Sequence, residues 1–167
     1  MIRLTMDEVV FNRVSPHQVS VISAQTPKGI TNLTPVSWWT FLESEPPMIG
    51  FSLSLESYTC ELAAKTGKVV VSFPGEAIAE AVFKCGSVTG REVNKAKEYG
   101  IELAEAPIGF PVHSRLAFIC TVNKKVEAGE CIFFVCDVDE ILFNENETQL
   151  YARGGSDKLA VLSEIIK

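Results

Sequence analysis

Short apolar runs separated by turn residues recur through the first half of this chain of 167 residues. Gln18–Thr26 is rich in Val, Ile and Ser, Pro46–Ser54 opens with a Pro-Pro breaker, and Lys68–Phe73 is short and β-branched. Such runs are typical of strands. The run over 30–41 contains Pro35, which cannot donate a hydrogen bond to a neighbouring strand. For 30–41 we therefore expect an edge strand, a bulge, or a strand interrupted by a functional loop.

Helical signals lie between these runs. Ser57 is an N-cap candidate, and Gly67 would stop the helix that begins after it. Apolar residues recur at helical spacing over 77–85, with Gly86 as the expected C-cap, and 91–100 resembles a further short helix. The C-terminal tail is also expected to end in a helix, whose shared face would carry Leu159, Leu162 and Ile166.

From Arg115 the pattern becomes strongly β. Large residues alternate over 115–127, Ala128–Glu130 forms a turn, and Cys131–Phe143 returns as a long, mostly apolar strand. The chain as a whole predicts six or seven strands with short helices between them. Because strands do not alternate with long helices, we expect a mainly β protein with a closed or split barrel, formed by one domain over 1–167.

The charge of the chain limits its partners. The net charge is −6 with a pI near 5.0, and no Lys/Arg cluster provides the basic face that phosphate backbones require. We therefore expect no nucleic-acid partner and no membrane partner. No apolar run approaches the roughly 18 residues of a membrane span, and acids interrupt the N-terminal segment. The expected location is cytoplasmic.

The metal-ligating residue types are sparse. Five cysteines form no C-x-x-C, and the two histidines are far apart in sequence, so we expect free, mostly buried thiols and no metal site. The cysteines are Cys60, Cys85, Cys120, Cys131 and Cys136.

No standard catalytic motif is present, so we name no catalytic side chain. The chain lacks a dinucleotide fingerprint, a P-loop and a nucleophile elbow. Hydroxyls and amides instead gather near strand ends and at Ser57, where a helix N-terminus either binds an anion or is simply capped. The adjacent Trp38 and Trp39 are candidates for a ligand platform, the core or a dimer interface. If the run is extended, the two rings point to opposite faces, which would place Trp39 in the core or the interface.

Four segments in order resemble the flavin reductase-like family, the group of FMN-binding split barrels that includes flavoredoxins. They read T-P-K-G-I-T-N-L-T-P-V-S-W-W (Thr26–Trp39), E-P-P-M-I-G-F-S (Glu45–Ser52), S-Y-T-C-E-L-A-A-K-T-G (Ser57–Gly67) and G-R-E-V-N-K-A-K-E-Y-G-I (Gly90–Ile101). The resemblance implies a six-stranded antiparallel split β-barrel that forms a homodimer and holds one FMN per subunit. The ligand's flat amphipathic ring and anionic tail suit a site of apolar walls, amides, hydroxyls and a lysine.

The resemblance also implies which residues hold FMN. Asn32 would meet the flavin, Ser37 and Trp38 would border the ring, and Lys95 would neutralise the phosphate. Thr31 belongs to the same segment, and Ser52, Ser57 and Thr59 would supply hydroxyls around the phosphate. Cys131 and Tyr151 are expected on the flavin and nicotinamide side.

One departure from the family separates the functional hypotheses. Cys131 stands where many relatives carry a His near the flavin and the nicotinamide path. The first hypothesis is an FMN-dependent oxidoreductase that takes hydride from NADH or NADPH. The second is a flavoredoxin-type electron carrier that docks a redox protein partner, and the third is a dimeric domain that has lost its flavin.

Overall fold

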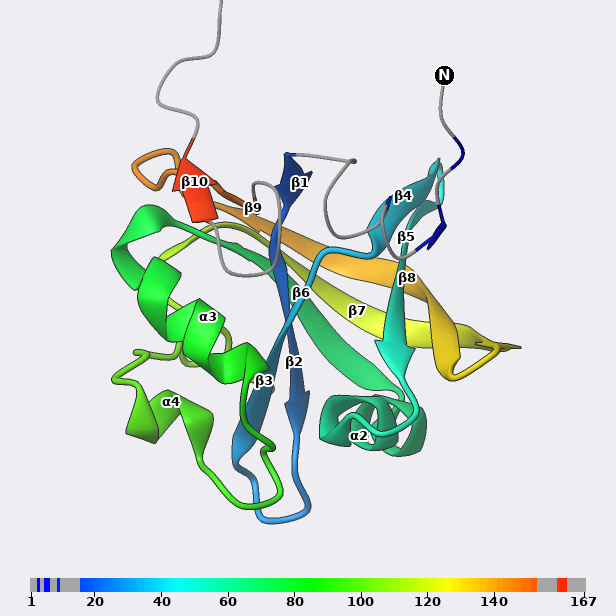
Figure 1. Ribbon diagram of the computed structural model, residues 1–167, viewed down its shortest axis with the longest axis horizontal. Coiled ribbons are helices and arrows are strands. Elements are labelled where there is room, and N and C mark those ends of the chain that lie inside the picture. Colours follow the sequence, from blue (N-terminus) through cyan, green and yellow to red (C-terminus); the bar gives the residue numbers. More distant parts are fainter. Residues whose placement is uncertain (1–2, 4, 7–8, 10–15, 153–158, 162–167) are drawn as a thin grey trace, which may run out of the picture.

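The computed structural model describes residues 3, 5–6, 9, 16–152 and 159–161. Its main elements are strands, joined by a few short helices (Figure 1). In chain order they are β1 (His17–Gln18), β2 (Ser20–Gln25), β3 (Thr31–Val36), β4 (Trp39–Ser44), β5 (Pro47–Ser54), α2 (Tyr58–Thr66), β6 (Lys68–Pro74), η1 (Glu76–Ile78), α3 (Ala79–Gly86), α4 (Lys95–Glu98), β7 (Ser114–Ala128), β8 (Cys131–Phe143), β9 (Leu150–Ala152) and β10 (Leu159–Val161).

Seven strands form one antiparallel sheet in the order β3-β2-β6-β7-β8-β5-β4. The expected mainly β, antiparallel architecture is confirmed. The sheet has seven strands, within the six or seven that the pattern predicts and one more than the resemblance implies, because the run containing Pro35 breaks at Ser37 and Trp38. Its first part, β3, forms one edge of the sheet, and its second part, β4, forms the other. Proline is tolerated at such an edge because no neighbour requires its missing N–H.

The sheet curls around one buried cluster, to which nearly every strand contributes. β2, β3, β5, β6, β7 and β8 supply, in turn, Ile22, Val36, Phe51, Val71, Phe118 and Phe134. Helix α2 closes one end by burying Cys60, Leu62 and Ala63 in the same cluster (Figure 1). This helix ends as expected at Gly67, whose φ of 66° is left-handed and whose N–H donates to the carbonyl of Ala63.

A second cluster covers the outer face of β2 and β3. Val21 and Leu33 pack there against Val82 of α3 and Ala96 of α4, while the neighbouring Ile22 faces the inner cluster. Alternate strand residues point to opposite faces, so β2 has apolar residues on both sides. The helices α3 and α4 are therefore fixed beside the edge strand β3 (Figure 1).

Trp38 and Trp39 have different environments, as the alternation of an extended chain predicts. The Trp39 indole N–H donates to the carbonyl of Gln18, and its ring lies edge-on to Phe73 at 4.6 Å between centroids. Trp38 is half exposed. Only Trp39 packs against the core.

Three local expectations were wrong. Gly86 is the last residue of α3 and Ser87 caps it, and the predicted helix over 91–100 is reduced to α4. In the tail, Leu159 begins the short strand β10, which pairs with β9 in a three-stranded sheet with β1. The helix-like positions Leu162 and Ile166 lie outside the described residues. None of the described helices has the length and apolar character of a membrane-spanning segment.

Candidate functional site

The edge strand β3, the start of α2 and the segment after α3 surround a hollow of about 340 Å³. Two polar side chains of β3, Asn32 and Thr34, form one wall. The segments around Ser57 and over 85–90 form the others, and Lys95 reaches the hollow from the start of α4. Asn32, Ser57 and Lys95, which are distant in sequence, are thus brought together.

Lys95 has an unusual environment for a lysine. Its side chain is 4% exposed, and Nζ donates a 2.7 Å hydrogen bond to the carbonyl of Cys85. Among the described residues, no carboxylate forms an ion pair with it. Burial lowers the pKa of Lys95 and raises that of the neighbouring Cys85 thiol to about 11. A buried ammonium ion without a counterion is unfavourable, so this position favours a bound anion.

The start of α2 adds further donors to the same hollow. Ser57 is the N-cap residue, but its side chain makes no capping hydrogen bond. The first N–H groups of a helix have no partner within the helix, and its dipole favours negative charge there. The Ser57 hydroxyl is therefore available to a ligand at the end where the helix attracts anions.

Asn32 is held rigidly. Its amide nitrogen donates a 2.7 Å hydrogen bond to the Thr59 hydroxyl, which lies 2.5 Å from the Thr34 hydroxyl. On the other side, Gly90 approaches so closely that an added Cβ would overlap the Asn32 amide. Thr59 itself is fully buried and lies beneath the hollow, supporting Asn32 and Thr34.

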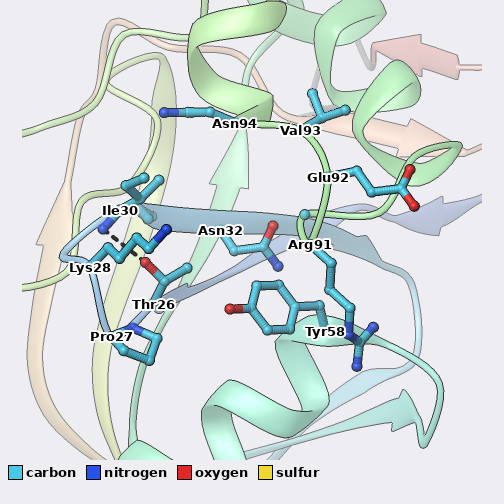
Figure 2. A pocket seen from close by; sticks show the side chains of 12 residues that line it. Thr26, Pro27, Lys28, Ile30, Asn32, Tyr58, Arg91, Glu92, Val93 and Asn94 are labelled. Atoms are coloured by element: carbon cyan, nitrogen blue, oxygen red, sulfur yellow. Dashed lines mark hydrogen bonds between the residues drawn. The ribbon is translucent and has the colours of Figure 1, made fainter.

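Two further hollows adjoin this one along β3. The first, of about 350 Å³, is lined by Ser37 and Pro35 and shares Gly86 and Ser87 with the Lys95 hollow. The second, of about 330 Å³, is lined by Thr31 and shares Asn32, Tyr58 and Gly90 with it. Figure 2 shows this second hollow.

Besides Thr59, four of the residues expected at the site lie beside the hollows rather than on their walls. The N–H of Ser52 in β5 donates to the carbonyl of Trp38 at 2.9 Å, which ties the break between β3 and β4 to β5. Cys131 pairs with Ser54, a residue of the Lys95 hollow. Tyr151 precedes Ala152, a residue of the Ser37 hollow.

A sequence model of the family described as "Flavin reductase like domain" matches residues 11–160. The chain belongs to this family. The match covers every element from β1 to β9 and reaches into β10.

Two relatives share part of this flavin reductase like domain. The uncharacterized protein YddH of Escherichia coli (strain K12) is 32% identical over 82 residues, which are 48% of this chain and 43% of that protein. An uncharacterized protein of Archaeoglobus fulgidus is 26% identical over 110 residues, 64% of this chain and 62% of that protein. The matches span less than two thirds of either relative.

Three solved structures share the fold over nearly their whole length. The flavoredoxin from Methanosarcina acetivorans has a TM-score of 0.85 at 21% identity, covering 100% of this chain and 94% of that one. The FMN-binding protein from Thermus thermophilus with bound p-hydroxybenzaldehyde has a TM-score of 0.86 at 21% identity, covering 100% and 98%. The 2-nitrobenzoate 2-nitroreductase of Pseudomonas fluorescens has a TM-score of 0.85 at 15% identity, covering 99% and 94%.

Sequence reasoning missed part of the site. The segment Gly86–Gly90 and the residues Tyr58 and Arg91 of this flavin reductase like domain also line the hollows. Two glycines flanking Ser87 and Thr89 were an available signal, because glycines mark places where backbone approaches another group closely. The contact between Tyr58 and Arg91 joins distant segments and had no such signal.

Proposed function

We propose that this protein binds FMN at the Lys95 hollow and acts as an oxidoreductase. The observation that carries the proposal is the buried Lys95 ammonium, which lacks a described carboxylate partner and shares a hollow with the uncapped start of α2. The phosphate of FMN supplies the anion that this arrangement favours. The family membership and the FMN-binding protein of the same fold support the choice of ligand.

Different predicted site residues would contact different parts of FMN. Lys95 and Ser57 would hold the phosphate end, and Asn32, fixed by Thr59, would supply an amide to the polar edge of the ligand. Ser37 and Trp38 would border the ring. Thr31 would complete the polar lining, and Ser52, whose N–H donates to the Trp38 carbonyl, would hold Trp38 beside the ring. Cys131 and Tyr151 would flank the side from which an electron donor approaches.

Bound FMN supplies the hydride and electron transfer, which amino-acid side chains alone do not perform. The chain's contribution is to bind and orient the cofactor and to keep the Lys95 proton in place opposite the phosphate. We propose NADH or NADPH as the electron donor, with free flavin or another acceptor as the recipient.

A flavoredoxin-type electron carrier is the second candidate, and Cys131 favours it. This residue is a partly buried thiol where the resemblance leads us to expect a histidine, beside Ser54 at the rim of the hollow. The net charge of −6 would assist docking to a basic redox protein. In this case the protein would have little intrinsic activity with NADH or NADPH.

We also propose a homodimer. Phe41 of β4 and Ile141 and Phe143 of β8 are 63%, 54% and 63% exposed. Ile141 pairs with Phe118 of the inner cluster, and the Phe41 ring lies edge-on to Phe118 at 6.0 Å. The apolar side chains on the core-facing side of the sheet thus extend beyond the buried cluster as an exposed apolar surface. A second copy of the chain would cover this surface.

The test begins with purified protein mixed with FMN and passed through a desalting column. Retained yellow colour supports flavin binding, whereas colourless protein after this treatment contradicts it. Lys95→Ala should lower FMN affinity, and the exposed Lys65, which lines no described hollow, provides the matched control Lys65→Ala. Anaerobic bleaching of the retained flavin by NADH or NADPH supports the reductase, and absence of bleaching with both supports the carrier.

A further inference from the structure

A further hollow adjoins the proposed flavin site along β3 (Figure 2). The hairpin residues 26–32 form one wall and residues 90–94 form the opposite wall, with the Tyr58 side chain between them. Its volume of about 330 Å³ nearly equals the 340 Å³ of the Lys95 hollow. Each volume lies near the lower end of the roughly 300–1,000 Å³ usual for small-molecule sites.

The three hollows follow the edge strand in order. From the end of β3 backwards, Pro35 and Ser37 line the first, Thr34 and Asn32 the second, and Asn32 to Ile30 the third. The Lys95 ammonium and Ser57, which we assign to the phosphate, are in the middle. The third hollow therefore begins where the phosphate end of FMN would lie.

Hydrogen bonds hold both walls of the third hollow in place. Thr26 and Ile30 are joined twice: the Thr26 N–H donates to the Ile30 carbonyl at 2.8 Å, and the Ile30 N–H donates to the Thr26 hydroxyl at 3.0 Å. Opposite, the Arg91 guanidinium lies 4.9 Å from the centroid of the Tyr58 ring and donates to the Glu61 carboxylate at 2.9 Å. The compartment is preformed, which lowers the entropic cost of binding a ligand.

The lining combines apolar and polar groups. Pro27 and the Tyr58 ring offer flat surface, and the Tyr58 hydroxyl points toward Thr26 (Figure 2). Lys28 reaches over the hollow, and among the described residues it has no ion-pair partner. Glu92 lines the same hollow, so one free cation and one acid are present. A flat heterocycle with a single phosphate nearby suits such a site better than a highly charged ligand.

We propose that the third hollow binds the adenosine half of FAD, so that the site holds FAD more tightly than FMN. This inference rests on the proposed flavin function, because the flavin half of the same molecule would occupy the Lys95 and Ser37 hollows. The pyrophosphate would pass from one hollow to the next beside Tyr58 and Gly90, which line both hollows. Lys28 would face its second phosphate.

A nicotinamide dinucleotide fits this position less well. To exchange a hydride, its nicotinamide must reach the flavin ring, which we assign to Ser37 and Trp38. The third hollow lies at the opposite end of the row, beyond Lys95. FAD joins a flavin to an adenosine through its two phosphates, so one molecule could occupy all three hollows along β3.

The test compares FMN and FAD by fluorescence titration of the full chain. We expect wild-type protein to bind FAD about tenfold or more tightly than FMN. Lys28→Ala should weaken FAD about three- to fivefold, as the loss of one exposed charge contact predicts, and leave FMN unchanged within twofold. Lys65→Ala should change neither. Adenosine, a separate probe that carries no phosphate and leaves the Lys95 position free, should lower the apparent affinity for FAD and leave that for FMN unchanged.

The outcomes separate this inference from the proposed function. Equal affinities for FMN and FAD, with adenosine affecting neither, would overturn the inference and leave FMN binding intact. Equal weakening of both flavins in Lys28→Ala, or equal competition of adenosine with both, would also overturn it, because either result places the contact in the flavin half. Failure of both flavins to bind would remove the proposed function, and the inference with it.

Discussion

The amide of Asn32 donates a 2.7 Å hydrogen bond to the hydroxyl of Thr59, a residue without solvent exposure. The Thr34 hydroxyl lies 2.5 Å from the same oxygen, so one buried hydroxyl holds two side chains of β3. Thr59 thus affects the proposed ligand only indirectly, by fixing the position of the Asn32 side chain. It is a positioning residue in a network, and its removal would leave buried polar groups without partners.

Thr59→Val should therefore destabilise the protein and weaken flavin binding together. Valine keeps the shape but leaves the Asn32 amide without its acceptor, at a cost of about 1–3 kcal/mol in the free energy of unfolding. Urea unfolding and FMN titration measure the two effects. Thr59→Ser retains the hydroxyl and should behave nearly as wild type. If Thr59→Val kept wild-type stability and affinity, the network would have no role in the site.

The buried Lys95 predicts opposite pH trends for ligand binding and for stability. Burial lowers its pKa, so FMN affinity should fall as pH rises through that lowered value, where the ammonium loses its proton. Between the lowered pKa and the ordinary lysine pKa, the unfolded chain binds more protons than the folded chain. The free energy of unfolding should therefore increase as pH rises through this range. The raised pKa of Cys85 has the opposite effect, because it lowers the free energy of unfolding as pH rises. The quantity to measure is therefore the difference in the free energy of unfolding between wild type and Lys95→Met at each pH. An identical pH profile in the variant would contradict this account.

Close packing between Gly90 and Asn32 predicts an energetic coupling between them. Gly90→Ala should destabilise the protein by about 1–3 kcal/mol, because the new Cβ overlaps the Asn32 amide. In an Asn32→Ala background, the same change should cost less, since the amide is gone. A double-mutant cycle of urea unfolding measures the difference, expected at about 0.5 kcal/mol or more. Additive effects would show that the loop moves freely away from β3.

Cysteine labelling should distinguish Cys131 from the other four thiols. Cys60, Cys85, Cys120 and Cys136 are buried, and burial raises the pKa of each thiol, to about 12 for Cys136. Cys131 is partly exposed. Iodoacetamide at pH 8 should modify the folded protein once, as mass spectrometry would show, and Cys131→Ser should remove that label. Labelling of several thiols before unfolding would contradict the buried placement.

The exposed aromatic and aliphatic side chains of β4 and β8 predict self-association. Phe41→Glu should weaken it by about tenfold or more, because burial of an aromatic side chain contributes about 1.5–3 kcal/mol. Light scattering across a concentration series measures the change. Leu55→Lys, at an exposed leucine beside α2, is the matched control. A wild-type protein that stays monomeric at high concentration would disprove the homodimer.

Elements whose formation is set by residues close to one another in sequence were predictable. Alternation along β7 and β8 identified the long hairpin, the glycine after α2 marked its end, and Pro35 indicated an edge or a broken strand. Features that depend on distant partners were not predictable. Leu159 has the spacing of a helix, yet β10 pairs with β9, and apolar spacing carries no information about that pairing.

In the candidate site, too, the sequence indicated which residues take part but not how their side chains are directed. The resemblance named Asn32, Ser57 and Lys95, and these residues share one hollow. It also named Thr59 as a phosphate neighbour, and the structure shows the Thr59 hydroxyl beneath Asn32, where it accepts from the Asn32 amide. Side-chain direction within a segment depends on how α2 docks against β3. Residue type and order alone do not determine it.

One run of chain, 31–44, forms both margins of the main sheet, with β3 at one and β4 at the other. The proposed flavin groove lies along the first margin, and the proposed self-association face includes the second. Ser37 and Trp38, where the run crosses over, connect the two margins directly. Thermodynamic reciprocity then requires that, if flavin strengthens pairing of two chains by some factor, pairing strengthens flavin binding by the same factor. In such a protein the supply of cofactor would set the fraction of paired molecules.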